Sequence, residues 1–113
     1  MIWNKLMART GSDDPVLRRF RAALSELYGD RIERVVLFGS RARGDAQEDS
    51  DYDIAVFLKD LDDRWREIHR IVPIVTDFLY RDEVFIHAMP YRAGSYRERT
   101  PLMHELRREG VDL

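Results

Sequence analysis

Apolar residues recur at helical spacing in the segment that follows Asp14. An aspartate followed by proline is typical of an N-cap and the first position of a helix, and Gly29 supplies a C-terminal stop. The apolar positions between them are Val16, Leu17, Phe20, Leu24 and Leu27. Because these positions fall on one face, the pattern predicts an amphipathic helix between Asp14 and Gly29.

Two short runs have the composition and period of β-strands. Residues 34–38 are apolar after the first position, with β-branched and aromatic members, and stop at Gly39, which is typical of a buried strand. Residues 52–58 alternate, with Tyr52, Ile54, Val56 and Leu58 on one face and Asp51, Asp53, Ala55 and Phe57 on the other. Polar residues 40–50 predict a tight turn into a short helix, then an acidic loop. Both aspartates are therefore expected on one side of the second strand.

The second half of the chain continues the alternation of helices and strands. Residues 62–80 are amphipathic, and Pro73 predicts that this helix is kinked or split. Its apolar residues are predicted to be core: Trp65, Ile68, Ile71, Val72, Val75, Phe78 and Leu79. Residues 84–89 predict a third strand, and Thr100-Pro101 opens a last helix that ends at Gly110. The order favours an α+β fold, a small mixed β-sheet with helices packed on one face and the other face partly open.

Size and charge restrict the kind of protein. A chain of 113 residues predicts one domain spanning 1–113, with 1–12 as a loose N-terminal arm. Net charge is -2, from 19 basic and 21 acidic residues, so a nucleic-acid partner is not expected. The absence of cysteine excludes disulfides, thiolate catalysis and zinc-thiolate sites. No apolar run approaches the roughly 18 residues that span a bilayer, so no membrane association and a cytoplasmic location are expected.

The chemistry concentrates between Gly39 and Asp53. Asp51 and Asp53 are two residues apart on a strand, which places their carboxylates roughly 6–7 Å apart and in parallel. Such oxygen ligands suit Mg²⁺ or Mn²⁺, which also accept substrate phosphates. Gly39 and Ser40 end a strand and begin a helical turn, where backbone N–H groups favour an anion. A metal-bound nucleoside triphosphate satisfies both halves of this site.

Other polar residues near this segment are weaker candidates for the nucleotide and metal site. Arg41 and Arg43 follow the turn, and at least one is expected to contact the phosphates as a fork-shaped donor. The loop acids Asp45, Glu48 and Asp49 are expected to be solvated, and His87 is expected to be packed on its strand. A set of C-terminal arginines is expected to form a solvated face, with docking of an acidic partner or an RNA end as the alternative: Arg92, Arg97, Arg99, Arg107 and Arg108.

The segment from Val35 to Leu58 resembles the signature of the minimal nucleotidyltransferases, a branch of the DNA polymerase β superfamily. The resemblance rests on a hydrophobic strand ending in Gly39-Ser40 and on the later SDYDI sequence that contains Asp51 and Asp53. The rival phosphate-binding sequence GxxxxGK[ST] is absent. The resemblance implies a polymerase β-like fold, phosphate binding by Gly39 and Ser40, and magnesium binding by Asp51 and Asp53.

The same family usually has a third carboxylate on the following strand. Residues 84–89 contain no acid, but Glu83 lies at the expected start of this strand and shares the parity of Phe85 and His87, with Asp82 adjacent. Glu83 is therefore the candidate third catalytic residue beside Asp51 and Asp53. If no third carboxylate is supplied, turnover is expected to be weak or lost while nucleotide binding survives.

The resemblance also implies an activity and a partner. Minimal members commonly act beside an all-helical HEPN-domain protein encoded nearby, in a toxin–antitoxin pair. The expected reaction is transfer of a nucleoside monophosphate, AMP from Mg-ATP or the equivalent from another NTP, to a hydroxyl of that partner. One alternative is a non-catalytic nucleotide-binding module that neutralises a partner by binding. Another is a small-molecule transferase whose acceptor site is completed by a homo-oligomer.

Overall fold

The computed structural model describes residues 14–113, so the expected arm of residues 1–12 lies outside the described part. Four strands form one mixed sheet in the order β3-β2-β1-β4. The central strands β1 (Ile32–Phe38) and β2 (Tyr52–Leu58) are antiparallel, and β2 is parallel to β3 (Ile86–Arg92). The last strand, β4 (Val111–Asp112), adds to β1. The mixed sheet confirms the predicted fold class.

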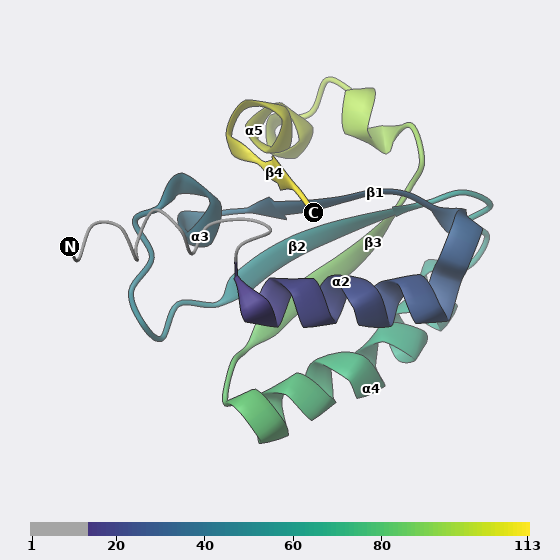
Figure 1. The fold of residues 1–113 in the computed structure, drawn as a ribbon. Helices are drawn as coiled ribbons and strands as arrows, with labels where there is room; N and C mark the ends of the chain where they lie inside the picture. Colours follow the sequence, from purple (N-terminus) through teal and green to yellow (C-terminus); the bar gives the residue numbers. More distant parts are fainter. Residues whose placement is uncertain (1–13) are drawn as a thin grey trace.

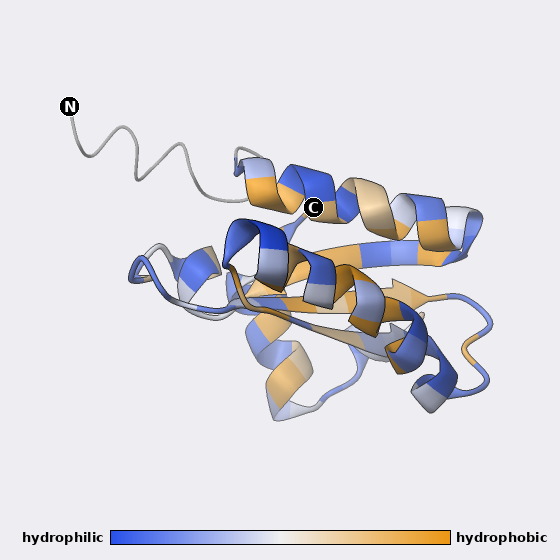
Figure 2. Ribbon diagram, turned by 90° about the horizontal axis from the view of Figure 1, so that it is seen from below, coloured by the Kyte–Doolittle hydropathy of each residue, from blue (hydrophilic) through white to orange (hydrophobic). Residues whose placement is uncertain are grey.

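Two long helices cover one face of this sheet (Figure 1). α2 (Pro15–Tyr28) begins at Asp14, whose carboxylate accepts from the Val16 N–H at 2.8 Å, as an N-cap should. α4 (Arg64–Asp82) connects β2 to β3 and crosses the sheet beside α2. Figure 2 shows apolar residues of the helices turned to the strands. The core between them includes the wholly buried side chains of Leu17, Phe20, Leu24, Ile54 and Val56.

A short helix packs on the opposite face of the sheet. α5 (Pro101–Glu109) buries Met103 and Leu106 against Val36, Ala55 and Phe57. The short helix α3 (Ser40–Arg43) and the 3-10 turns Gly29–Arg31 and Ser95–Arg97 complete the secondary structure of the described residues. The two long helices therefore share a face, as expected, and α5 covers part of the other face, which was expected to be partly open and without helices. The reason is that Ala55 and Phe57, which alternate with the core residues of β2, also need apolar partners.

α4 differs from its prediction in two ways. Of the two predicted effects of Pro73, the split does not occur, because the carbonyl that loses its donor belongs to exposed His69 and can bind water; the kink stays a prediction. Several of its apolar residues are not core: Trp65 is 71% exposed and Val72 49%. Leu79, at the same seven-residue spacing, is also exposed. The buried residues of α4 are Glu67, Ile71 and Phe78.

The third strand begins later than predicted. Glu83 is the C-cap of α4 in a left-handed conformation (φ 56°), and β3 starts only at Ile86. Before the strand, the Phe85 carbonyl already accepts from the Tyr52 N–H at 2.9 Å. The C-terminal strand β4 was not predicted, because two residues are too few for a periodic signal. None of the helices among residues 14–113 has the length and apolarity needed to cross a membrane.

Candidate functional site

The turn after β1 lies directly against the second aspartate of the Asp-x-Asp sequence. Gly39 has φ 77°, and a Cβ atom at this position would lie 2.5 Å from Asp53 Oδ2. Phe38 is the partner of Asp53 in the antiparallel register, so the end of β1 and the start of β2 bring the two together. Glycine is favoured here by its positive φ, and a Cβ atom would push the Asp53 carboxylate out of its position.

The two aspartates of the Asp-x-Asp sequence lie at the start of the second strand. Asp53 is on β2 with its side chain 33% exposed, and Asp51 is an exposed residue immediately before the strand. Ala55 and Phe57 share the face of Asp53, which confirms the alternation predicted for this strand. Within residues 14–113, no three acidic or histidine side chains are close enough to hold a metal by themselves. The open carboxylates fit Mg²⁺ or Mn²⁺, since these ions take their remaining ligands from water and phosphates.

Ser40 begins the short helix α3 (Ser40–Arg43), and Gly39 is its N-cap. The Gly39 carbonyl accepts from the N–H groups of Ala42 and Arg43, both at 3.1 Å, which fixes the turn immediately after β1. Gly44 ends the helix in a left-handed conformation. The first turn of a helix has N–H groups without intrahelical acceptors. The turn at Gly39 and Ser40 therefore presents backbone donors beside the Asp53 carboxylate.

Arg41 anchors the acidic loop. Its Nε donates to the Ser50 carbonyl at 3.0 Å, a terminal nitrogen donates to the Glu48 carbonyl at 3.1 Å, and the guanidinium lies 4.0 Å from the centre of the Tyr52 ring. Backbone carbonyls and a ring face thus hold the guanidinium in place. Through these contacts Arg41 fixes the segment that leads into Asp51, and its predicted contact with phosphates stays a prediction.

Arg43 is more exposed and pairs with two acids. Its Nε is 3.2 Å from Asp45 Oδ2, and a terminal nitrogen is 3.6 Å from Glu109 Oε1. The hydrogen bond to Asp45, followed by the charge of the same carboxylate, raises the pKa of the Arg43 guanidinium. Because Glu109 belongs to α5, Arg43 links the turn after β1 to the helix on the far face of the sheet. Its predicted contact with nucleotide is not tested by these pairs.

Glu83 does not share a strand face with the aspartates. As the C-cap of α4 it lines an open pocket of about 640 Å³ together with Asp82 and the loop residues Gln47, Glu48 and Asp49. The strand parity that made it the third carboxylate therefore does not apply. Asp82 is engaged by Arg19, whose two terminal nitrogens lie 3.1 and 2.9 Å from its carboxylate oxygens. A catalytic role for Glu83 remains a prediction.

The residue beside Asp53 on the third strand is His87. The two are partners in the parallel register of β2 and β3, and His87 Nδ1 lies 3.6 Å from Asp53 Oδ1. The His87 side chain is 60% exposed, so the expectation that it is packed is wrong. No local pattern in the sequence marked this position, because the pairing of parallel strands is set by the connection between them.

A second-layer hydrogen bond supports the start of β2. The Tyr52 hydroxyl donates to Asp14 Oδ2 at 2.7 Å in a buried position, and Asp14 also caps α2. The guanidinium of Arg41 stacks over the ring of Tyr52. Asp14, Tyr52 and Arg41 therefore connect the start of α2 to the loop that precedes Asp51. Sequence reasoning found the cap and missed the connection.

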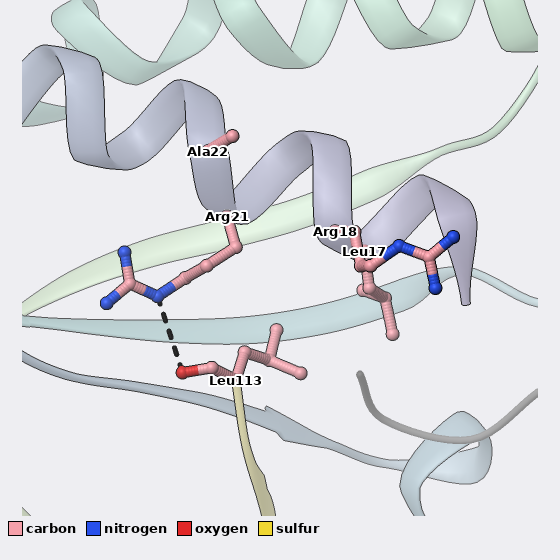
Figure 3. A pocket seen from close by; sticks show the side chains of 5 residues that line it. All are labelled: Leu17, Arg18, Arg21, Ala22 and Leu113. Carbon is pink, nitrogen blue, oxygen red and sulfur yellow. Dashed lines mark hydrogen bonds between the residues drawn. The ribbon is translucent and has the colours of Figure 1, made fainter. Parts of the chain in front are cut away.

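A separate apolar pocket of about 310 Å³ lies between α2 and the C-terminus (Figure 3). It is lined by Leu17, Arg18, Arg21, Ala22 and Leu113, and the Arg21 Nε donates to the Leu113 carbonyl at 3.3 Å. None of the predicted site residues lines it. The site at Gly39 and Asp53 is distinct from this pocket in position and in chemistry.

Known structures share this fold. A crystal structure described as that of an inferred nucleotidyltransferase from Sulfolobus solfataricus superposes with a TM-score of 0.60 at 18% identity, covering 84% of this chain and 73% of that one. Chains of the MntA–HepT toxin–antitoxin and of a toxin–antitoxin with AMP-PNP give TM-scores of 0.56 and 0.54. Each is 18% identical and covers 83% of this chain and 69% of the other.

Sequence relatives agree with the fold. A protein of Methanocaldococcus jannaschii named as an inferred protein adenylyltransferase, MJ0141, is 28% identical over 98 residues, which are 87% of this chain and 95% of the relative. The family model described as nucleotidyltransferase domain matches residues 17–100, which include the turn after β1, the Asp-x-Asp sequence and β3. The resemblance seen in the sequence is confirmed, and the chain belongs to the nucleotidyltransferase domain family.

Proposed function

We propose that this protein transfers AMP from ATP to a hydroxyl group of a partner protein, with Mg²⁺ or Mn²⁺ as the metal. One observation carries the proposal: the backbone at Gly39 lies against the carboxylate of Asp53, so that a Cβ atom would come within 2.5 Å of Oδ2. This contact puts a turn with backbone donors beside a carboxylate suited to a hard cation. In a metal-bound triphosphate, the phosphates would accept from the backbone donors of the turn and the metal ion would bind the carboxylate.

The residues divide the work between them. Asp51 and Asp53 would hold the metal ion. The ion would neutralise the negative charge that develops on the phosphates during the reaction. Ser40 and the N–H groups of the turn would orient the triphosphate. Arg41 would act indirectly, since its guanidinium holds the carbonyls of Ser50 and Glu48 and so positions the residue that follows them.

The reaction is an in-line displacement at the α-phosphorus. The acceptor oxygen forms a bond to that phosphorus, the bond to the bridging oxygen breaks, and pyrophosphate leaves with the bonding electrons. The hydroxyl proton passes to water or to a carboxylate of the site. Catalysis then depends on holding the acceptor in line rather than on covalent chemistry by the protein.

The relatives support a protein as acceptor. MJ0141 is named as an inferred protein adenylyltransferase, and two structural neighbours are toxin–antitoxin chains, one of them with the ATP analogue AMP-PNP. We propose that the partner is an all-helical HEPN-domain protein encoded nearby, in a cytoplasmic toxin–antitoxin pair. Self-association to complete an acceptor site would be the arrangement of a small-molecule transferase.

Label transfer tests the reaction. The protein is incubated with Mg²⁺, the product of the neighbouring gene and ATP labelled at either the α- or the γ-phosphate. The expected result is label on the partner from α-labelled ATP alone, with release of pyrophosphate and loss of transfer in Asp53→Asn. Transfer from γ-labelled ATP would indicate a kinase instead, and equal transfer by Asp53→Asn would place the reaction elsewhere.

A non-catalytic nucleotide-binding module is the second candidate. It is favoured by the composition of β3, which contains no carboxylate between Ile86 and Arg92, and by the position of Glu83 on the cap of α4. Such a module would bind Mg-ATP and its partner without releasing pyrophosphate. Pyrophosphate release measured over many hours, with and without the partner, separates the two candidates.

A further inference from the structure

One side of α4 is apolar although it does not face the core. Figure 1 shows α4 at the outer side of the helical layer, with α2 beside it. Away from the buried residues of the helix, five apolar residues recur at the alternating three- and four-residue steps of a coiled-coil seam. We name these residues the α4 stripe: Trp65, Ile68, Val72, Val75 and Leu79. Trp65, Val72 and Leu79 are exposed, and Ile68 and Val75 are half-buried.

The α4 stripe lies on a part of the helix without charged residues. At roughly 100° per residue the stripe covers about 80° of the helix surface, and its neighbours towards solvent are His69, Thr76 and the exposed Tyr80. The charged residues of α4 all lie outside this sector: Arg64, Arg66, Glu67, Arg70, Asp77, Arg81 and Asp82. In a chain with 35% charged residues, an exposed apolar surface without charge is typical of the centre of a protein interface.

The spacing of the stripe is the same in both directions from its centre. Trp65 and Leu79 are each seven residues from Val72. In an antiparallel pair of α4 helices with Val72 at the centre, Trp65 of each copy therefore lies opposite Leu79 of the other. The large indole then meets a smaller side chain at both ends of the contact. A parallel pair would instead place the two indoles against each other.

The charges that border the stripe favour the same arrangement. Arg64 and Asp82 lie on one flank of α4 at opposite ends of the helix. In a two-fold antiparallel pair the same flank of each helix meets, so Arg64 of one copy comes within about one turn of Asp82 of the other. Asp82 already accepts two hydrogen bonds from Arg19, and a carboxylate has further lone pairs for a second guanidinium. A parallel pair would bring like charges together.

We infer that the α4 stripe is the contact between two copies of this chain, which associate through antiparallel α4 helices. The stripe is roughly 21 Å long and one helix wide, which is small for a specific interface. The dimer therefore forms in concentrated solution, and in dilute solution the chain is a monomer with Val72 exposed. α4 covers one face of the sheet, whereas Asp53 shares the face of Ala55 and Phe57, which α5 covers. The contact does not rest on the proposed function.

Sedimentation velocity of the whole protein, from a few micromolar to several hundred micromolar, measures the association. The wild type should change from monomer to dimer. Val72→Arg puts two like charges at the centre of the contact and should weaken dimerisation about tenfold or more, and Trp65→Ser should also weaken it. Ala22→Arg adds the same charge at an exposed position of α2 and should dimerise as the wild type does. Circular dichroism checks that each variant is folded.

Cross-linking measures the orientation, because the chain contains no cysteine. Residues 65 and 79 are about 21 Å apart along α4, and a disulfide requires Cα atoms within about 7 Å. On oxidation of concentrated protein, a mixture of Trp65→Cys and Leu79→Cys should form a disulfide-linked dimer that joins the two variants. Neither variant should form a disulfide-linked dimer by itself.

Three results would overturn the inference. A wild type that stays monomeric at every concentration would do so, including where the product of the neighbouring gene or a phospholipid vesicle binds the wild type and not Val72→Arg. Dimerisation of Val72→Arg at wild-type strength would place the contact on another surface. Disulfides within each single variant, and none between Trp65→Cys and Leu79→Cys, would show a parallel pair. None of these results bears on the site at Gly39 and Asp53.

Discussion

Gly39 and Asp53 are in contact across the first two strands, because the backbone of the glycine occupies the space next to Oδ2 of the carboxylate. A Cβ atom on residue 39 would lie 2.5 Å from that oxygen. Gly44, five residues later, also has a positive φ (85°), yet a Cβ there would meet nothing within 4 Å. Gly39 combines its positive φ with ψ -159°, a conformation that essentially only glycine adopts, whereas Gly44 has ψ 11° and lies in the ordinary left-handed region. The two glycines also differ in the contact with the site.

Replacing each glycine with alanine separates these two requirements. Gly44→Ala should cost roughly 1–2 kcal/mol of stability from its left-handed backbone, and Gly39→Ala should cost more, because its φ and ψ are essentially restricted to glycine. Only Gly39→Ala should displace Asp53 and weaken binding of Mg-ATP, by tenfold or more on the usual cost of disturbing a metal ligand. Thermal unfolding and calorimetry measure the two effects. Binding of Mg-ATP by Gly39→Ala at wild-type affinity would show that the contact has no part in the site.

Arg41 and Arg43 should respond differently to the same change. Lysine cannot reproduce the fork with which Arg41 holds the carbonyls of Ser50 and Glu48. Arg41→Lys should therefore accelerate hydrogen exchange of the amides at residues 45–50, whereas Arg43→Lys should not. Exchange measured by mass spectrometry on peptides of this loop gives the comparison. Equal protection of the loop in all three proteins would remove the anchoring role assigned to Arg41.

Much of this region was predictable because its signals are local. The Asp14 cap, the alternation along 52–58 and the stop at Gly39 each depend on neighbours in the sequence, and the structure has them as predicted. The position of His87 opposite Asp53 depends instead on how α4 returns the chain to the sheet. Glu83 was misplaced because Val84 and Phe85 look like strand residues, whereas the left-handed cap of α4 delays the strand to Ile86.

Burial on α4 shows a second limit of the sequence. Periodicity identified the helix, but more apolar residues were present than one face can bury, so it could not tell which of them are core. Ile71 is 2% exposed and its neighbour Val72 is 49% exposed. Ile71 is buried and Val72 is exposed because the sheet and α2 pack against only one side of α4.

That difference between neighbours predicts a difference in stability. Ile71→Ala removes a buried side chain and should cost about 2–5 kcal/mol. Val72→Ala changes an exposed position and should alter the free energy of unfolding by roughly 0.5 kcal/mol or less. Urea unfolding of both variants measures this. Similar losses in the two proteins would mean that Val72 is covered in solution.

The buried hydrogen bond between Tyr52 and Asp14 should contribute to stability. Tyr52→Phe leaves a buried carboxylate oxygen without the donor that lies at 2.7 Å, which should cost about 1–3 kcal/mol. Tyr80→Phe is the matched control, because Tyr80 is 80% exposed, and it should be nearly neutral. If thermal unfolding shows no difference between these variants, the hydrogen bond does not stabilise the start of β2.

The ion pair between Arg19 on α2 and Asp82 on α4 should be visible in an acid titration. The hydrogen bond from Arg19, together with its charge, holds the pKa of Asp82 below its ordinary value of 3.8. A depressed pKa in the folded state contributes stability above the unfolded pKa, and this contribution is lost as pH falls through the folded value. NMR titration should show the Asp82 pKa rising in Arg19→Gln, with a smaller rise in Arg19→Lys. An unchanged pKa would mean that the ion pair is not formed in solution.

The central claim, a metal-dependent nucleotide site at Gly39 and Asp53, is tested most directly by calorimetry with ATP and no acceptor. The wild type should bind ATP in the presence of Mg²⁺ or Mn²⁺ and lose most of this affinity in EDTA. Asp51→Asn and Asp53→Asn should bind weakly under both conditions. Glu48→Gln, which removes the same charge from the adjacent loop, should bind as the wild type does. ATP binding of equal strength in EDTA and in both aspartate variants would contradict the account.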